Sequence, residues 1–216
     1  MPRTRIKVCG LRDEETAFAA VEAGADALGF VFAAGSPRLI DPDDAGDIAL
    51  SLPPFVTSVA LFAGVKEKRI AETIEEHPYF DMIQLHGDEA EPTVRACGDL
   101  GMDLIKAIRF NENTEAELHR WNRFEELDAI LVDGSAGGAG EPFDWEAFAE
   151  VAEASDHPII IAGGLTPENV GEAITVIRPY GVDVSSGVEH TRGVKDVGLI
   201  AEFCAAVQEV DRSFDE

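Results

Sequence analysis

Two side chains that can exchange protons each stand just before a glycine, at the end of a short apolar run. Cys9 belongs to Lys7-Val8-Cys9-Gly10, and Asp133 belongs to Leu131-Val132-Asp133-Gly134. A thiol and a carboxyl on opposite sides of a small substrate can act as a base and an acid. The alternatives are a buried cysteine that behaves as a small hydrophobe and an aspartate that caps a turn. Their placement at the ends of different runs makes Cys9 and Asp133 the candidates for a catalytic acid and base, with both alternatives still open.

Later segments rich in small residues indicate an anion site. Gly163-Gly164 and Ser185-Ser186-Gly187 follow apolar runs. Backbone N–H groups in such turns point positive dipoles at a phosphate, although glycine also simply makes turns. Arg38, in Ser36-Pro37-Arg38, could hold a carboxylate through two parallel hydrogen bonds, the alternative being a surface arginine. These segments predict a substrate with a phosphate at one end and a carboxylate at the other.

These groups lie at the ends of short apolar runs that alternate with longer segments of helical period. The ends of successive runs are about 25 residues apart on average, which is room for one strand, one helix and two short loops. An open doubly wound sheet is the alternative, but it usually has fewer strands and a glycine fingerprint after the first. We predict a single-domain (β/α)8 TIM barrel of eight parallel strands over residues 1–216. The predicted strands are Arg5 to Cys9, Ala27 to Phe32, Thr57 to Phe62, Met82 to His86, Leu104 to Arg109, Ala129 to Asp133, Ile159 to Ala162 and Val182 to Ser185.

Amphipathic segments between the strands predict the helices, and their acidic first turns suit the helix dipole. The longest irregular segment, Gly134 to Pro142, follows the sixth strand. Because catalytic loops lie at the carboxyl ends of barrel strands, we predict a flexible glycine-rich lid there, with an ordinary mobile connection as the alternative. Predicted helices include Glu14 to Ala23, Lys66 to Glu76, Glu115 to Phe124, Glu168 to Ile177 and, as the eighth, Val194 to Val210.

Strand alternation also predicts a charge pair inside the barrel. Lys7 shares the strand face of Cys9, and Asp183 shares the face of Ser185, so both charges should point inward. A closed barrel makes the first and last strands neighbours. Because an unpaired buried charge is very costly, we predict an ion pair between Lys7 and Asp183 beneath the site.

The charge balance excludes several classes of partner. The chain has 42 acidic and 17 basic residues and a formal charge of −25. Such a surface repels nucleic acid and anionic membranes. Its three cysteines, Cys9, Cys97 and Cys204, lack the close spacing of metal sites or disulfide scaffolds, and no apolar run approaches the ~18 residues of a membrane span. We predict a cytoplasmic protein, monomeric or homodimeric, without a metal.

The composition of the surface predicts adaptation to salt. Only five of the 17 basic residues are lysines, and the acidic excess is spread along the chain. Hydrated carboxylates keep a protein dispersed in concentrated salt, where counterions screen their repulsion. The alternative is an acidic protein from a mesophile. We expect the melting temperature to rise across a KCl series; a constant or falling temperature would refute the halophile hypothesis.

Six segments along nearly the whole chain together carry a family resemblance. They are Lys7-Val8-Cys9-Gly10-Leu11, Gly29-Phe30-Val31-Phe32 with Ser36-Pro37-Arg38, Gln84-Leu85-His86-Gly87, the Asp133 loop ending in Phe143-Asp144-Trp145, Ala162-Gly163-Gly164-Leu165, and Gly181 through Glu189. Some of these motifs are weak alone, but six in register are specific. The sequence resembles the phosphoribosylanthranilate isomerase family of tryptophan biosynthesis.

The resemblance implies a (β/α)8 barrel that converts N-(5-phosphoribosyl)anthranilate into its 1-amino-1-deoxyribulose phosphate isomer, an Amadori rearrangement that needs no cofactor. It implies that Asp133 is the general acid that protonates the furanose ring oxygen. Cys9 would be the general base that removes the proton from the second sugar carbon, and Arg38 would bind the anthranilate carboxylate. The implied substrate-binding residues are Arg38, Gln84, His86, Gly163, Gly164, Asp183, Ser185, Ser186 and Gly187.

The implied roles place demands on both side chains. Asp133 must keep its proton at working pH, so burial or a nearby negative charge should raise its pKa. Cys9 must be able to lose its proton in a strongly negative molecule, so a cation or polar donor should lie near it. Arg38 and the helix starts at the rim are the candidates for this donor.

Two residues depart from the pattern of the family. Arg12 stands where the family often has threonine, and Ala139 stands where it often has a hydroxyl residue. These positions affect loop details, because neither carries the acid or base role. One alternative is the ProFAR isomerase of histidine biosynthesis, which has an aspartate in the place of Cys9. Others are a flavin-binding barrel and a non-catalytic barrel that binds phosphorylated metabolites.

Overall fold

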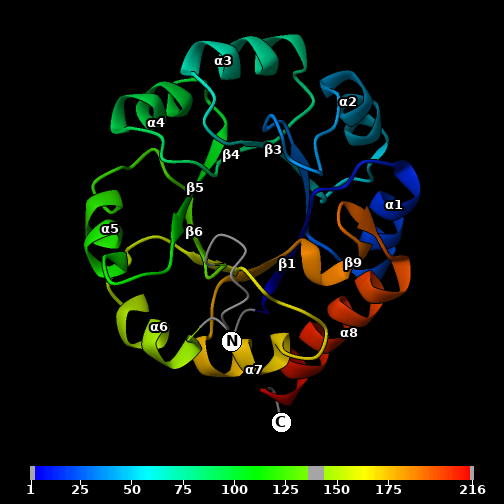
Figure 1. The fold of residues 1–216 in the computed structure, drawn as a ribbon, viewed down its shortest axis with the longest axis vertical. Helices are drawn as coiled ribbons and strands as arrows, with labels where there is room; N and C mark the ends of the chain where they lie inside the picture. Colours follow the sequence, from blue (N-terminus) through cyan, green and yellow to red (C-terminus); the bar gives the residue numbers. More distant parts are fainter. Residues whose placement is uncertain (1–2, 136–143, 215–216) are drawn as a thin grey trace.

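The computed structural model describes residues 3–135 and 144–214. Within these ranges eight parallel strands form a closed barrel, with eight helices around it (Figure 1). The barrel strands are β1 (Arg5–Cys9), β2 (Ala27–Val31), β3 (Thr57–Phe62), β4 (Met82–Leu85), β5 (Asp103–Arg109), β6 (Ala129–Asp133), β7 (Ile159–Ala162) and β8 (Gly181–Val184). The helices are α1 (Glu14–Ala23), α2 (Pro42–Ser51), α3 (Glu67–Glu76), α4 (Glu91–Gly98), α5 (Thr114–Trp121), α6 (Trp145–Ala152), α7 (Val170–Ile177) and α8 (Val197–Ser213).

Pairing of the first and last strands closes the ring. Lys7 of β1 lies opposite Asp183 of β8, and Val8 lies opposite Val184. Every other neighbouring pair is also parallel, so all eight strands end at the same rim. The predicted (β/α)8 TIM barrel is confirmed.

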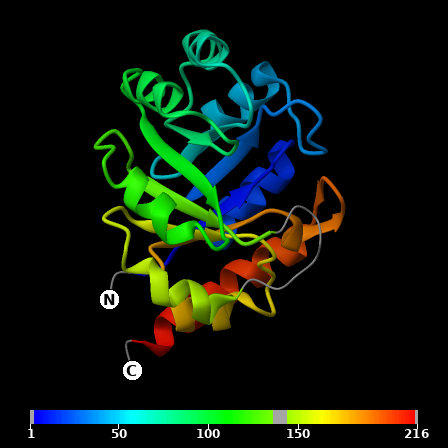
Figure 2. The same ribbon diagram turned by 60° about the vertical axis from the view of Figure 1, so that its left-hand side comes forward.

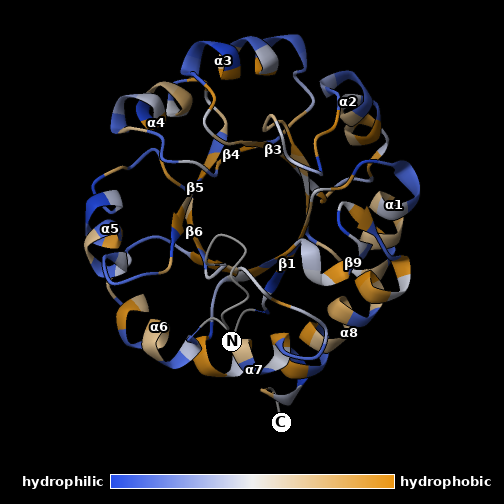
Figure 3. Ribbon diagram, in the orientation of Figure 1, coloured by the Kyte–Doolittle hydropathy of each residue, from blue (hydrophilic) through white to orange (hydrophobic). Residues whose placement is uncertain are grey.

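The main core lies between the strands and the helices. Figure 3 shows apolar residues along the strands and on the barrel-facing sides of the helices, with hydrophilic residues outside. Phe203 of α8 and Trp121 of α5 are among the largest fully buried side chains. Local sequence fixes the helix ends: the Asp13 carboxylate accepts from Thr16 N at 2.8 Å to begin α1, and Gly24, at φ 101°, ends it. The apolar faces of the helices therefore pack against the outside of the barrel.

Four predicted strands, at β1, β3, β6 and β7, have the same bounds in the structure. Those at β2, β4 and β5 differ by one residue at one end, and β8 both begins and ends one residue earlier than predicted. The predicted eighth helix begins too early. Residues 189–195 instead form an antiparallel hairpin of β9 (Glu189–Thr191) and β10 (Val194–Lys195), after a short 3-10 helix η1 (Ser186–Val188). Gly193 turns the hairpin at φ 83°. Asp196 then begins α8 by accepting from Gly198 N and Leu199 N.

The hairpin extends from the barrel beside the loops that follow the strands (Figure 2). Most of the predicted glycine-rich lid, residues 136–142, lies outside the described residues, as does Ala139. Across the described ranges, no helix is both long enough and apolar enough to span a bilayer.

Candidate active site

A cavity of about 270 Å³ opens at the carboxyl ends of the strands and brings most of the predicted site residues together. Cys9 of β1 and Asp133 of β6 both line it. Gln84 and Gly187 are predicted site residues that do not line it. The predicted residues that do are Cys9, Arg38, His86, Asp133, Gly163, Gly164, Asp183, Ser185 and Ser186.

The Cys9 thiol is buried beside an ammonium group. A Cβ atom built on Gly29 of β2 would lie 2.7 Å from Cys9 Sγ and 3.1 Å from Lys7 Nζ, so Gly29 leaves the space that both groups share. Burial raises the pKa of the thiol, and Lys7 and Lys195 oppose this shift. The cation expected near Cys9 is therefore Lys7, from the same strand. The candidates expected from the sequence were instead Arg38 and the helix starts at the rim.

Lys7 and Asp183 form the predicted buried pair. Lys7 Nζ donates to Asp183 Oδ1 at 2.8 Å, and their side chains are 5% and 6% exposed. Burial disfavours the charge on Lys7, but Asp183 and Cys9 outweigh it and raise the pKa of Lys7. The prediction of this pair is confirmed, and the same ammonium lies close to the Cys9 thiol.

Lys7→Met should lower the free energy of unfolding by about 3 to 5 kcal/mol, because the Asp183 carboxylate is left buried without its counterion. Denaturant unfolding followed by tryptophan fluorescence measures the loss. The double variant Lys7→Met/Asp183→Asn, which removes both charges, should regain at least half of it. A single variant within ~1 kcal/mol of the wild type would show that the pair does not control stability.

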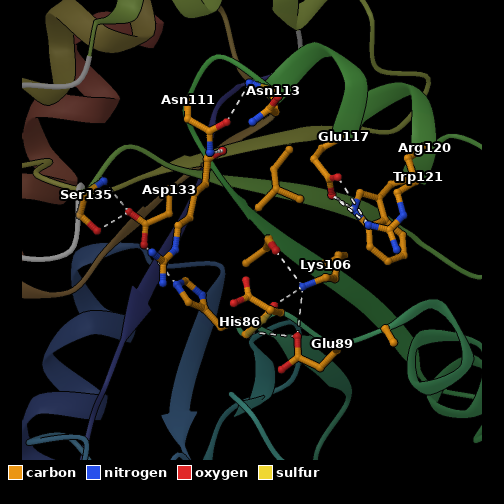
Figure 4. Close-up of a pocket in the computed structure, with 16 residues that line it drawn as sticks. His86, Glu89, Lys106, Asn111, Asn113, Glu117, Arg120, Trp121, Asp133 and Ser135 are labelled. Atoms are coloured by element: carbon orange, nitrogen blue, oxygen red, sulfur yellow. Dashed lines mark hydrogen bonds and ion pairs between the residues drawn. The ribbon is translucent and has the colours of Figure 1, made fainter.

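Asp133 is held by donors on two sides. His86 Nε2 lies 3.1 Å from Asp133 Oδ2, while Oδ1 accepts from Ser135 N at 2.8 Å and from the Ser135 hydroxyl at 2.6 Å (Figure 4). Burial favours the protonated carboxyl, but the hydrogen bonds from His86 and Ser135 outweigh it and lower the pKa of Asp133. The expectation of a raised pKa is wrong for the site without substrate, because these donors stabilise the carboxylate.

His86 is in turn held from below by Gln84 of β4. Gln84 is fully buried, and its Nε2 lies 2.8 Å from His86 Nδ1. Gln84 Oε1 is buried and has no hydrogen-bond partner among the described residues. Gln84 therefore acts on the cavity through the imidazole that it orients.

The loops after β7 and β8 have the backbone expected of an anion site. Gly163 and Gly164 adopt φ values of 90° and 69°, which favour glycine. A Cβ atom on Gly163 would also collide with Asp133 Oδ1 and Ser135 N, so this glycine lets the two sides of the site approach. Ser185 donates its hydroxyl to Cys9 O at 2.9 Å, which joins the β8 loop to the end of β1.

Gly187 lies one layer behind the cavity. A Cβ atom there would overlap the carbonyl of Leu165, so Gly187 lets the β8 loop pack closely on the β7 loop. Its contribution to the predicted anion site is close packing of the two loops.

Arg38 reaches the cavity from the loop after β2, but one edge of its guanidinium is occupied. Nε and Nη2 donate to the two oxygens of Glu189 at 2.5 and 2.9 Å. Sequence reasoning assigned no role to Glu189, to its second partner Lys195 or to Ser135. The Asp-Gly-Ser turn was a usable signal for Ser135, because aspartate often accepts from the backbone two residues on.

A second cavity, of about 580 Å³, adjoins the first along β4, β5 and β6 (Figure 4). His86, Asp133 and Ser135 border both. Its buried charges already pair with each other: Lys106 Nζ lies 3.0 Å from Glu89 Oε2, with both side chains 3% exposed. Asp133 therefore faces two cavities, and the smaller is the one that it shares with Cys9.

Across residues 3–135 and 144–214, no cluster of three or more His, Cys, Asp or Glu side chains is arranged to hold a metal ion. The groups around the smaller cavity are proton donors and acceptors, a guanidinium and open backbone amides. Fold and site together define the class of TIM-barrel enzymes, with side chains suited to acid–base chemistry on a small anionic substrate.

Comparison with known proteins agrees with this class. The family model described as N-(5'phosphoribosyl)anthranilate (PRA) isomerase matches residues 6–206, and the chain belongs to this family. An N-(5'-phosphoribosyl)anthranilate isomerase of Pseudomonas fluorescens is 42% identical over 214 residues, which cover 96% of this chain and all of that protein.

Solved structures extend the similarity to the whole barrel. One is a phosphoribosyl anthranilate isomerase in complex with reduced 1-(o-carboxyphenylamino)-1-deoxyribulose 5-phosphate, with a TM-score of 0.83, 36% identity and coverage of 95% of this chain and 99% of that chain. Monomers generated from the dimeric enzyme of Thermotoga maritima align with a TM-score of 0.80, 33% identity and the same coverage. The family match excludes the alternatives of a ProFAR isomerase and a flavin-binding barrel.

Proposed function

We propose that Cys9 and Asp133 are the general base and the general acid of the PRA isomerase reaction, which is the activity of the family to which the chain belongs. The observation that carries this proposal is that both side chains line one cavity, from strands β1 and β6. A proton donor and a proton acceptor on different strands can address different atoms of one bound sugar.

The anion-binding groups place the substrate between them. The phosphate binds to the backbone amides and hydroxyl groups of Gly163, Gly164, Ser185 and Ser186. Arg38 accommodates the anthranilate carboxylate with the edge of its guanidinium that Glu189 leaves open. The sugar then spans the cavity, with its ring oxygen toward Asp133 and its second carbon toward Cys9.

The reaction proceeds by two proton transfers. Asp133 gives its proton to the furanose ring oxygen as the bond from this oxygen to the first sugar carbon breaks, and the nitrogen lone pair forms a protonated Schiff base. The Cys9 thiolate then removes the proton from the second carbon, and the C–H electron pair forms the C=C bond of an enolamine while the C=N electrons return to nitrogen. The enolamine tautomerises to the amino ketone, and solvent returns the proton of Cys9 to Asp133.

Substrate binding shifts the proton of the Cys9–Asp133 pair toward the carboxyl of Asp133, where the reaction needs it. Without substrate, Asp133 is more acidic and Cys9 less acidic than usual. A bound phosphate and carboxylate bring negative charge into the cavity, which raises the pKa of Asp133, and Lys7 stays beside Cys9 to stabilise the thiolate. The pair therefore becomes competent when the substrate occupies the site.

The fluorescence decay of freshly prepared phosphoribosylanthranilate, with the protein in high KCl, tests the proposal. The wild-type protein should accelerate the decay, and the double variant Cys9→Ala/Asp133→Ala should not, because it lacks both proton-transfer groups. Chromatography of the ketose product distinguishes isomerisation from hydrolysis. A double variant as active as the wild type would overturn the assignment of the pair. A folded wild type without turnover would instead favour the non-catalytic metabolite-binding barrel.

Three properties of the whole protein remain part of this proposal. A single barrel domain over residues 1–216 is supported by the closed ring of strands. A cytoplasmic location is supported by the acidic composition and free cysteines. A monomer or a homodimer is expected, and the similar enzyme of Thermotoga maritima is described as dimeric.

A further inference from the structure

The hairpin of β9 and β10 carries two buried charges into the wall of the site. Glu189 and Lys195 lie 3.0 Å apart, with side chains only 3% and 2% exposed. Glu189 Oε2 also accepts from Gly193 N at 2.9 Å, across the turn of the hairpin. Despite burial, Arg38, Gly193 and Lys195 lower the pKa of Glu189 to about 2, so its carboxylate is ionised throughout the working range.

Lys195 ties this pair to the predicted phosphate loop. Its Nζ donates to Ser185 O at 2.8 Å, to Ser185 Oγ at 3.3 Å and to Glu189 Oε1 at 3.0 Å. Three acceptors around one nitrogen match the three N–H groups of an ammonium ion. Burial lowers the pKa of Lys195, and the Glu189 carboxylate opposes that shift. The hairpin therefore joins the Ser185 loop to the Arg38 loop through one carboxylate.

The Arg38 side chain is confined on two sides. Glu189 binds its Nε and Nη2. On the other side Gly10, at φ 81°, lies so close that a Cβ atom there would be 2.5 Å from Arg38 Cδ. A planar guanidinium offers two carboxylate-sized edges, one at Nε and Nη2 and one at Nη1 and Nη2. Because Glu189 occupies the first, the second is the one presented to a ligand.

The charges of Arg38, Lys195 and Glu189 favour an anion at the open edge of the Arg38 guanidinium. Arg38 and Lys195 carry two positive charges, and Glu189 supplies one negative charge, so the cluster has a surplus of one positive charge in a chain of net charge −25. A single carboxylate at the open edge of Arg38 would balance the cluster. A ligand without that carboxylate leaves a partly buried guanidinium edge without a partner, which is unfavourable.

We propose that Glu189, supported by Lys195, is a positioning residue that fixes Arg38 as the receptor for the carboxylate of the substrate. Glu189 thereby determines specificity for an aryl amine that carries an ortho carboxylate over one that does not. The inference rests on the role of Arg38 in the proposed function. It adds that the hairpin after β8, and not the loop of Arg38 alone, sets this selectivity.

Two substrates that differ only in the carboxylate test the proposal. Condensing ribose 5-phosphate with anthranilate or with aniline gives phosphoribosylanthranilate and its decarboxylated analogue, and chromatography quantifies both ketose products. The measured quantity is the ratio of the two kcat/KM values, and the wild type should prefer the carboxylated substrate. Glu189→Gln should lower this ratio at least about tenfold, mainly by raising KM for phosphoribosylanthranilate. The kcat/KM for the analogue without the carboxylate should change much less.

Matched variants separate positioning from general damage. Arg38→Met removes the receptor and sets the lowest ratio, and Glu189→Gln should lower it no further in the Arg38→Met background. Glu126→Gln removes a charge that pairs with Arg95 at 2.8 Å outside the cavity, and the ratio should stay at the wild-type value. Arg38→Lys keeps the charge but has no second hydrogen-bonding edge, so its kcat/KM ratio should fall toward that of Arg38→Met. This variant tests the two-edge geometry independently of Glu189→Gln, and so also covers the case in which Glu189→Gln does not fold.

The outcomes distinguish this inference from the proposed function. An unchanged ratio in Glu189→Gln, an equal loss with both substrates, or tighter binding of phosphoribosylanthranilate would overturn the positioning role of Glu189. Full selectivity in Arg38→Lys would overturn the two-edge geometry. An unchanged ratio in Arg38→Met would instead refute the assignment of Arg38 itself, without touching the acid and the base.

Discussion

Replacing Asp133 by asparagine should lower kcat for phosphoribosylanthranilate about 10³- to 10⁴-fold, the upper part of the range for loss of a general acid. The amide is nearly the same size as the carboxyl, and its oxygen can still accept from Ser135, but it has no acidic proton for the ring oxygen. The loss should appear equally in kcat and kcat/KM, because the proton moves only in the transition state. Steady-state fluorescence assays measure both constants.

A matched control for this variant is Asp13→Asn. Asp13 also accepts backbone and hydroxyl hydrogen bonds, from Thr16 at the start of α1, but it does not line the cavity. Asparagine caps helices about as well as aspartate, so the control should keep wild-type stability and turnover. An Asp133→Asn variant within tenfold of the control would remove Asp133 from the role of acid.

The pH profile of the wild-type enzyme follows from the two shifted pKa values. The donors from His86 and Ser135 lower the pKa of Asp133, and burial raises the pKa of Cys9, so the resting pair holds its one proton on the thiol. The reactive form holds it on the carboxyl. Because both forms bind one proton, their ratio does not depend on pH between the two pKa values. Hence kcat/KM should be flat from about pH 6.5, where the substrate phosphate is mostly dianionic, and should fall only above the pKa of Cys9. An acidic limb near neutral pH would show that the lower pKa of the pair lies there, which would contradict the lowered pKa of Asp133 or the raised pKa of Cys9.

Cys9→Ala should lower kcat about 10²- to 10⁴-fold, because Lys7, the neighbouring basic group on β1, is protonated and paired with Asp183 and cannot take the proton from the second sugar carbon. The change leaves only a small space in the wall of the cavity. Binding of the reduced, unreactive product analogue should stay within about threefold of the wild type, as expected when an interaction made only in the transition state is lost. Isothermal titration and steady-state kinetics measure the two effects.

Cys204→Ala is the control for a buried thiol. Cys204 is fully buried in α8 and does not line the cavity, and burial raises the pKa of its thiol to about 12. Its alanine variant should keep wild-type turnover. If Cys9→Ala also keeps it, a different group removes the proton and the proposed base is wrong.

Much of the scaffold could be predicted because its signals are local. The apolar runs at β1, β3, β6 and β7 have the same bounds in the sequence and in the structure. Strand alternation and ring closure were enough to pair Lys7 with Asp183. The placement of Cys9 and Asp133 at strand ends predicted a shared rim, where the structure gives them one cavity.

Other features depend on contacts that no local pattern records. Lys195 lies in the first turn of the predicted helix Val194 to Val210, so the hairpin that joins it to Glu189 was missed, although Gly193 and Asp196 were available as turn and cap signals. The direction of the pKa shift of Asp133 was wrong because His86, directly after β4, and Ser135 both donate to its carboxylate, and the contact with His86 has no local signal. Burial can be anticipated from a sequence more easily than the donors that surround a buried group.

Closure of the ring between β1 and β8 has a consequence for the synthesis and folding of the chain. Cys9 lies on the first strand synthesised, and the Asp183 and Ser185 contacts that hold the end of that strand lie more than 170 residues later. During nearly all of translation, Cys9 of the nascent chain therefore lacks the neighbouring residues of β8 and its loop. Turnover should begin only when β8 has paired with β1, so recovery of activity during refolding reports this pairing.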